Sequence, residues 1–304
     1  MLHLRVICPE DLAGRVADVL TAQVGVVAVR RAGPSTDGTE LSADLARECA
    51  DEVLGTLRRL GVLDAGLVSL EPLDTALGTL AERAERDAPG EGADALIWDE
   101  LTGRTGEDST LTGVFLAFMV LATVLAAIGV VTDSAVTVVG AMVVGPEFGA
   151  LAGIAVGLVG RRLAMARRAA VALLVGFPAA IVGTGVLAVV ARATGLIHPS
   201  DITGPGRETE FIYHPGWFSL ITAVVAGTAG MLSLTSSKSA ALVGVFISVT
   251  TIPAAGNAAV GGVLGRWHET WQSLAQLGIN IVGIVVAGML TLTVLRRLST
   301  ARGA

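Results

Sequence analysis

The residues best suited to chemistry lie where two long apolar segments are interrupted by proline. In the first segment, Ser134 to Arg161, Glu147 follows Pro146 near the middle. An acid at the bilayer centre costs roughly 2.5–3.5 kcal/mol on insertion scales, and a proline inside a helix costs about 3 kcal/mol. We therefore expect a broken helix that faces protein or water. Glu147 then either couples a proton or cation, or closes the break with an internal hydrogen bond, and both interpretations stay open.

The second segment, Ser239 to Arg266, carries polar groups around its own break. Their hydroxyl and amide groups could satisfy freed backbone groups or coordinate a ligand. Asn280, in a later apolar run, is more often a contact between helices than a ligand. We predict no catalytic residue, metal ligand or cofactor. The predicted substrate- or ion-binding residues are Gly145, Pro146, Glu147, Gly149, Thr250, Thr251, Pro253, Asn257 and Asn280.

The elements that must position these residues follow from composition. Hydrophobic residues make up 52% of the chain and charged residues 16%, against about 25% charged in a soluble domain. The charges concentrate before about Thr110, which predicts a soluble part followed by a membrane domain, 111–304. A membrane span needs about 20 mainly apolar residues. Six segments qualify: 111–131, 134–159, 169–190, 217–234, 239–264 and 274–295.

The six predicted spans contain an internal repeat, about 111–192 and 217–297. Ser134 matches Ser239, and the closing Gly157, Gly160 and Arg161 match Gly262, Gly265 and Arg266. Three spans per repeat is an odd number, so the two repeats would have inverted topology. The two breaks would then meet near mid-membrane, at a pseudo-two-fold axis. Small residues four apart on each broken segment would let helices approach closely.

The N-terminal part, 1–75, alternates strand-like and helix-like patterns in the order βαββαβ, which predicts an α+β ferredoxin-like domain. A regulatory or assembly role and a passive structural cap are both open. Residues 76–110 form a linker with an amphipathic helix and a short interfacial helix. Cys8 and Cys49 have no zinc-type spacing and are expected to be small buried hydrophobes.

Charge asymmetry predicts the orientation. Arginines cluster after the second and sixth spans, which favours cytoplasmic N- and C-termini in the inner (plasma) membrane. The net charge of −6 gives no support for nucleic-acid binding. On the opposite side, Asp133 is expected to cap the second span. The acids and histidines of the loop 194–216 lack the tight spacing of metal ligands, so we expect a solvated loop rather than a metal site.

At these segments the chain resembles the uncharacterised hydrophobic domain family of bacterial and archaeal integral membrane proteins, domain of unknown function 389. The resemblance is carried by IGVVTDSAVTVVGAMVVGPEFGALAGIAVGL, ALVGVFISVTTIPAAGNAAVGG, LGINIVGI and the earlier VSLEPLDT, and it extends over nearly the whole chain. Members more commonly have an apolar residue where this chain has Glu147, and a double proline near Pro253. The resemblance implies an integral membrane protein and brings no substrate.

These observations favour a secondary transporter or channel for an unknown ion or small solute, with its site at the two broken helices. The alternative is a non-transporting membrane scaffold or sensor whose soluble domain binds a ligand or partner. No HExxH or GxSxG signature is present, so an enzyme is not expected. The expected partners are membrane lipid and, because of the glycine ridges, further copies of the chain.

Overall fold

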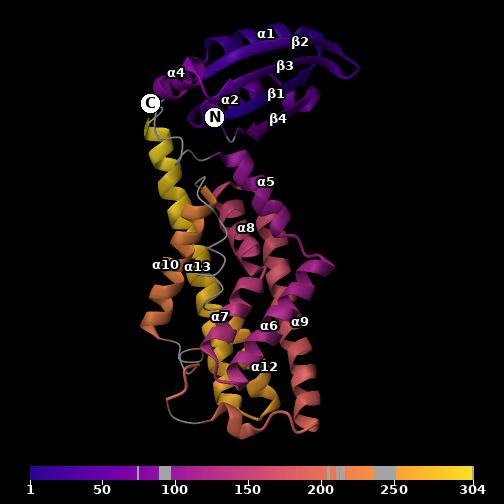
Figure 1. The fold of residues 1–304 in the computed structure, drawn as a ribbon, viewed down its shortest axis with the longest axis vertical. Coiled ribbons are helices and arrows are strands. Elements are labelled where there is room, and N and C mark those ends of the chain that lie inside the picture. The colour runs from indigo at the N-terminus through magenta and orange to yellow at the C-terminus, as the bar shows by residue number, and fades with distance from the viewer. Residues whose placement is uncertain are drawn as a thin grey trace. The chain divides into compact units, whose positions relative to one another are not determined.

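The computed structural model describes residues 1–73, 75–88, 97–203, 206–209, 212, 216–235 and 251–302 (Figure 1). They divide into two compact units. One is built around Met1–Asp99, and the other comprises Glu100–Leu234 and Lys238–Leu295. The units are considered separately below.

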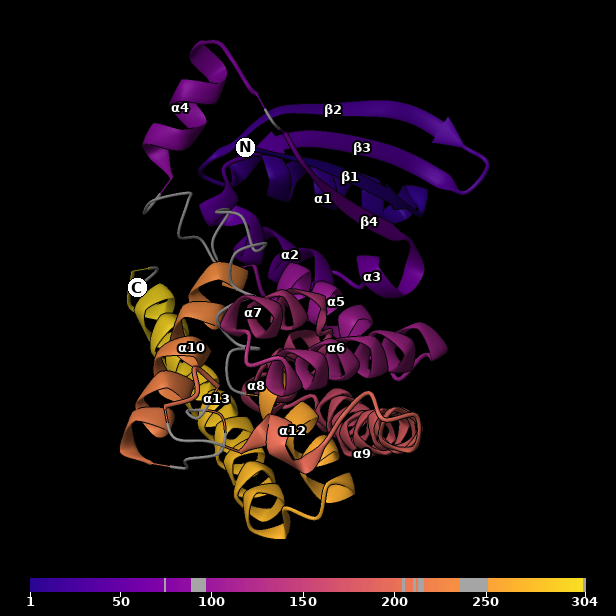
Figure 2. The ribbon, with the colours of Figure 1, turned by 60° about the horizontal axis from the view of Figure 1, so that its bottom comes forward.

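The N-terminal unit contains an antiparallel sheet of four strands. The strands are β1 (Leu2–Cys8), β2 (Val26–Ser35), β3 (Gly38–Leu45) and β4 (Leu67–Pro72), in the order β2-β3-β1-β4 (Figure 2). The main helices are α1 (Glu10–Ala22) and α2 (Ala50–Arg59), with the short η1 (Arg47–Cys49) and α3 (Val62–Ala65) on either side of α2. The predicted β-α-β-β-α-β order is present, with these two short elements added.

Alternation along β1 builds the core of this unit. Leu2, Leu4 and Val6 are buried together with apolar residues of α1 and α2. Arg5 points the other way and forms an ion pair with Glu40 across the sheet, at 2.9 Å. Both cysteines are free and buried, and burial raises the pKa of Cys49 to about 11. Cys8 and Cys49 are therefore small core residues, as predicted.

The second unit consists of helices. Two shorter helices precede the apolar ones: α4 (Thr79–Asp87), in the first unit, and α5 (Trp98–Asp108), which runs into the second. Then follow α6 (Gly113–Val131), α7 (Ala135–Val144), α8 (Glu147–Val159), α9 (Leu163–Ala193), α10 (Trp217–Thr235), α12 (Ile252–Val263) and α13 (Trp267–Arg302), with η3 (Pro199–Ile202) after α9.

Among the described residues, four helices are long and apolar enough to cross a membrane: α6, α9, α10 and α13. The pair α7 and α8 makes a fifth, because the two helices are bent by 54° at a short break. Residues 239–250 of the predicted span 239–264 lie outside the described residues, and α12 is the helix of this span that is seen. Six spans therefore remain a prediction.

The outer faces of these helices are apolar. On α6, Val114, Phe118, Leu121 and Leu125 are all more than a third exposed, and their spacing of three and four places them on one face. Similar exposed valines and leucines follow α9, α10 and α13. Apolar surface of this extent is rare on soluble monomers, so it supports a lipid-facing surface.

The helices before and after the loop 194–216 share a constant spacing. Both ends of α10 come 104 residues after the ends of α6. The start of α13 and the end of α12 come 104 residues after the start of α9 and the end of α8. We call α6–α9 the first half and α10–α13 the second half.

Candidate functional site

The break between α7 and α8 has a local cause. Gly145 has φ −66° and ψ 128°, the extended conformation that a following proline imposes. Pro146 has no N–H to continue the hydrogen-bond ladder of α7, and α8 starts afresh at Glu147. The predicted interruption at Pro146 is therefore present, and it places an acid in the first turn of a helix, where the helix dipole favours negative charge.

Glu147 is completely buried. The Thr251 hydroxyl donates a hydrogen bond to Glu147 Oε1 at 2.9 Å. Gly145 makes the room, because a Cβ there would overlap the Glu147 carboxyl and lie 2.9 Å from Cγ1 of Ile252. The carboxyl is thus folded back over Gly145, between the starts of two helices.

The second helix of this meeting is α12. It begins at Ile252, directly after Thr251, and Pro253 occupies its first turn, where the missing N–H costs nothing. Pro253 therefore starts a helix. Thr250 lies outside the described residues. We call the meeting of Gly145, Glu147, Thr251 and Ile252 the helix-start junction.

Asn257 and Asn280 belong to a different cluster. The Asn257 amide Nδ2 donates to Ser273 Oγ at 2.8 Å, and the Ser219 hydroxyl donates to Asn280 Oδ1 at 3.0 Å. Gln276 in turn donates from Nε2 to the Ser219 oxygen. These two hydrogen-bonded groups, Asn257 with Ser273 and Ser219 with Gln276 and Asn280, follow each other along one face of α13, and together we call them the polar seam.

Sequence reasoning included Asn257 and Asn280 and missed Ser219, Ser273 and Gln276. The missed signal was periodicity: Ser273, Gln276 and Asn280 are three and four residues apart and share one face of α13. All three are at least 95% buried. Buried polar side chains at this spacing mark a continuous polar strip along an otherwise apolar helix.

Gly149 has a packing role. A Cβ at Gly149 would lie 2.5 Å from Cβ of Asp108, at the end of α5. Further along α8, a Cβ at Gly157 would lie 2.7 Å from the backbone nitrogen of Ala166. The small residues of α8 thus allow close backbone approach, and the structure places Gly149 against α5.

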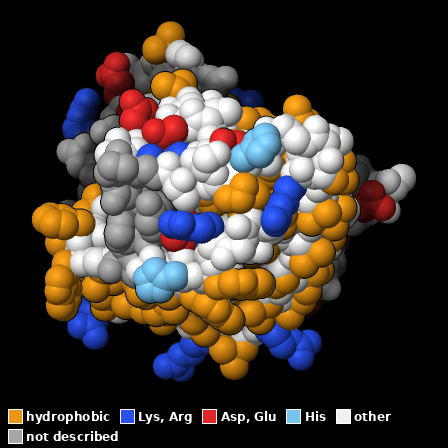
Figure 3. Space-filling view, turned by 90° about the horizontal axis from the view of Figure 1, so that it is seen from below, with side chains coloured by type: hydrophobic (Ala, Val, Ile, Leu, Met, Phe, Trp, Pro, Cys, Tyr) orange, Lys and Arg blue, Asp and Glu red, His pale blue; other side chains and the backbone are white. Residues whose placement is uncertain are grey.

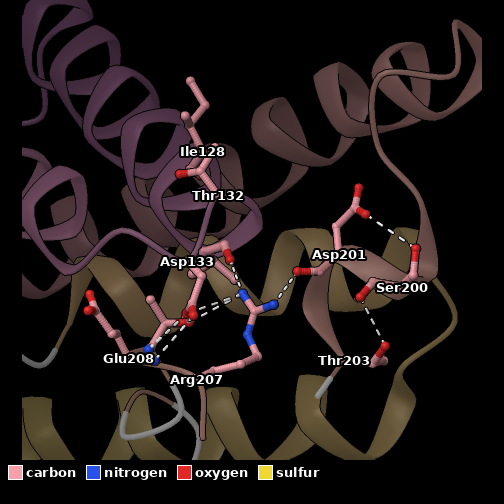
Figure 4. Close-up of polar contacts among 10 residues, drawn as sticks. Ile128, Thr132, Asp133, Ser200, Asp201, Thr203, Arg207 and Glu208 are labelled. Atoms are coloured by element: carbon pink, nitrogen blue, oxygen red, sulfur yellow. Dashed lines mark hydrogen bonds and ion pairs between the residues drawn. The ribbon is translucent and has the colours of Figure 1, made fainter. Parts of the chain in front are cut away.

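Asp133 connects the turn between α6 and α7 to the loop 194–216 that follows α9 (Figure 4). It accepts hydrogen bonds from the Thr209 hydroxyl at 2.8 Å, the Thr209 N–H at 3.2 Å and the Glu208 N–H at 3.3 Å. The Thr209 hydroxyl, the Thr209 and Glu208 N–H groups and nearby Arg207 lower the pKa of Asp133. The predicted cap is wrong, because the Ser134 hydroxyl caps α7 by accepting from Thr137 N.

Arg207 completes this contact. Its guanidinium lies 3.5 Å from Asp133 Oδ1 and donates to the backbone carbonyls of Val130 and Asp201. Val130 lies in the last turn of α6, so the cation binds the negative end of that helix. Figure 3 shows the surface seen from below Figure 1, where histidine, basic and acidic side chains lie beside a band of hydrophobic ones and further basic side chains project beyond that band. Among the described residues, no three His, Cys, Asp or Glu side chains gather as a metal site.

Comparisons with known proteins bear on the segment that carries both clusters. Residues 142–286 match the family model described as a domain of unknown function, DUF389. The match runs from the end of α7 into α13 and so includes the helix-start junction and the whole polar seam. The comparisons with curated proteins and with solved structures returned no match. The predicted resemblance to this family is confirmed over residues 142–286.

Proposed function

We propose that this membrane protein is a secondary transporter for an ion or small solute, with Glu147 as its proton-carrying group. One observation carries the proposal: a carboxyl with no exposed surface lies at the meeting of two helix starts within a bundle of apolar helices. Ionisable groups at such positions are expensive to bury and mark proton and ion pathways. Discontinuous helices whose N-termini meet are the usual setting for transporter sites.

The constant spacing of the helices supports an inverted repeat. The turn between α8 and α9 has Arg161 at φ 56°, and the turn between α12 and α13 has Gly265 at φ 77°. In both turns the next residue, Arg162 or Arg266, donates its N–H to the carbonyl five residues earlier, at 2.7 and 2.8 Å. These positions are again 104 apart. Two halves with three spans each would be related by an axis in the membrane plane.

The helix-start junction then has a special place. Glu147 and Thr251 are themselves 104 residues apart and bond to each other. Equivalent residues in two related halves can touch only near the axis that relates them. Protonation of Glu147 would remove the charge that the Thr251 hydroxyl and the two helix dipoles stabilise. It would thereby loosen the contact about which the halves could rock.

A flux assay tests this proposal. Purified protein in liposomes should move a solute in response to a pH gradient, and Glu147→Gln should abolish that dependence while Glu147→Asp retains part of it. Glu269→Gln is the matched control, because Glu269 is paired with Arg266 at the start of α13. Equal pH-dependent flux in wild type and Glu147→Gln would refute the role of Glu147.

The tight packing of α12 favours the alternative of a membrane scaffold or sensor. Every residue from Ile252 to Gly261 is buried, and a Cβ at Gly256 would lie 2.9 Å from the backbone of Ala127. Asn257→Cys and Ser273→Cys, without Cys8 and Cys49, discriminate the two. Reaction with aqueous thiol reagents in the membrane supports the transporter, and complete protection of both supports the scaffold.

Orientation and assembly complete the proposal. The arginines after the second and sixth predicted spans would place both termini in the cytoplasm of a cell with an inner membrane. The N-terminal sheet unit would regulate or assemble the membrane unit, and the chain would form a homo-oligomer. Reporter fusions at each terminus and cross-linking in native membranes measure these two properties directly.

A further inference from the structure

We propose that the polar seam binds a monovalent cation through neutral amide and hydroxyl oxygen atoms. The inference rests on the proposed transport function only in that it supplies a coupling ion, since binding itself needs no transport. The seam consists of Ser219, Asn257, Ser273, Gln276 and Asn280, which meet from α10, α12 and α13.

The first half contains the same contacts in apolar form. Asn257 bonds to Ser273 in the second half. The residues 104 positions earlier are Gly153 and Ala169, and they also lie close together: a Cβ at Gly153 would lie 3.2 Å from Cβ of Ala169, and 2.7 Å from Cβ of Ser109 in the α5–α6 connection. The backbone positions are therefore equivalent, while the side chains have changed from small apolar to polar.

The second contact repeats this relation. Ser219 bonds to Asn280. Their counterparts, again 104 positions earlier, are Phe115 and Gly176, and a Cβ at Gly176 would lie 2.9 Å from Cε1 of Phe115. Gln276 likewise corresponds to the fully buried Ala172. The architecture thus forms without any of these polar groups, and helix packing alone does not explain the seam.

The polar seam also contains a buried oxygen atom without a hydrogen-bond partner among the described residues. Its hydrogen bonds run from Gln276 to Ser219 and from Ser219 to Asn280. Gln276 is the first donor in this series of hydrogen bonds, and its other polar atom, Oε1, is buried and has no hydrogen-bond partner among the described residues. Only 4% of the surface of Gln276 is exposed. A buried acceptor in that position is stabilised by a donor or a cation.

The type of oxygen selects the ligand. Hard cations bind amide and hydroxyl oxygens, whereas divalent sites in proteins draw on carboxylates. None of the five seam residues carries a carboxylate. Neutral oxygens suffice for alkali cations, whose hydration shell they replace in channel filters. Buried Thr270 continues the polar strip of α13 toward the helix start, which gives a polar approach.

The test measures cation-dependent stability of the purified full chain in detergent. NaCl, KCl or LiCl replaces choline chloride at constant ionic strength, and the melting temperature is followed. One alkali chloride should raise it saturably, by about 2–4 °C. Ser273→Ala with Gln276→Ala, which takes the residue types of the first half, should abolish the rise. Thr291→Ala is the matched control, because its hydroxyl bonds only within α13, to the Ala287 carbonyl at 2.9 Å.

A second variant keeps the inference falsifiable if the double variant fails to fold. Gln276→Glu preserves the shape and adds a negative charge, so it should lower the cation concentration at half-effect by about tenfold. Three results overturn the inference. They are an equal melting temperature in choline chloride and in all three alkali chlorides, a rise retained in the double variant, and a cation concentration at half-effect that Gln276→Glu leaves unchanged. A cation-dependent rise without flux in liposomes would sink the transport proposal alone, and flux without the rise would sink this one alone.

Discussion

The two halves of the membrane unit share a spacing of 104 residues between helix ends and differ in chemistry. In the first half, the strip of α9 that faces its neighbours is small and apolar, and Phe115 of α6 packs against Gly176. In the second half, the corresponding strip of α13 is polar, and Ser219 of α10 bonds to Asn280. The comparison teaches that close helix contact can be made by small apolar residues, as in the first half, or by hydrogen-bonded polar residues, as in the second.

The two halves differ equally at their helix starts. The first half contributes the acid Glu147, and the second contributes the hydroxyl of Thr251, its counterpart in position. An identical pair of acids there would repel, whereas an acid and a hydroxyl form a hydrogen bond. The unlike side chains at this junction thus form a hydrogen bond where two ionised acids would repel.

Giving a residue of one half the identity found 104 positions away in the other half should have the largest effect on stability. Phe115→Ser removes a buried ring from the first half and should destabilise the protein by about 3–5 kcal/mol, as Phe→Ala does in cores. Ser219→Phe leaves Asn280 without its donor. Adding Asn280→Gly should restore stability, because it recreates the Phe115–Gly176 contact. Thermal unfolding in detergent measures all three, and a double variant no better than Ser219→Phe contradicts the equivalence.

Adding one methyl group at close backbone contacts should come next. Gly157→Ala in the first half and Gly256→Ala in the second should each cost about 1–3 kcal/mol, since a Cβ would lie 2.7 Å and 2.9 Å from backbone nitrogens. Gly140→Ala is the control, with no atom within 4 Å of its Cβ. A variant that melts at the wild-type temperature would contradict the close backbone contact at its position.

Removing the hydroxyl at the helix-start junction should have a smaller effect. Thr251→Val deletes the hydrogen bond to Glu147 and should cost about 0.6–1.7 kcal/mol, the range for polar contacts between membrane helices. Thr251→Ser keeps the donor and should stay near wild type. Chemical unfolding in mixed micelles measures both. Identical stability of the two variants would show that the bond contributes nothing.

The smallest effect is expected from acidification, at the contact between Asp133 and residues 208 and 209 of the loop that joins the two halves. Because hydrogen bonds lower the pKa of Asp133 below its unfolded value of 3.8, its stabilisation is present above that pH and is lost as pH falls through the folded value. The protection of the Glu208 and Thr209 amides from hydrogen exchange, relative to the intrinsic rate at each pH, should therefore fall only below about pH 4. Asp133→Asn should show the faster exchange already at pH 7. Fast exchange in wild type at pH 7 would contradict the contact.

Several features could be predicted because they depend on neighbouring residues. Pro146 imposes an extended Gly145 and a new helix start wherever it occurs. The strand and helix alternation of the N-terminal unit is equally local, and the family resemblance was correct over 142–286. The repeat itself stays a prediction, and the matching turn bonds, to the carbonyls of Gly157 and Gly261, favour a spacing of 104 residues for it.

The sequence by itself determined where the chain leaves water, where α7 must stop and which residues could carry charge or hydrogen bonds inside the apolar region. Steric exclusion by proline and the cost of burying polar groups act locally, so they can be read along the chain. Only the tertiary structure decided that Glu147 meets Thr251 while Asn257 and Asn280 join Ser273 and Ser219. Those partners depend on which helix faces come together in three dimensions, and the packing of small residues between helices selects those faces.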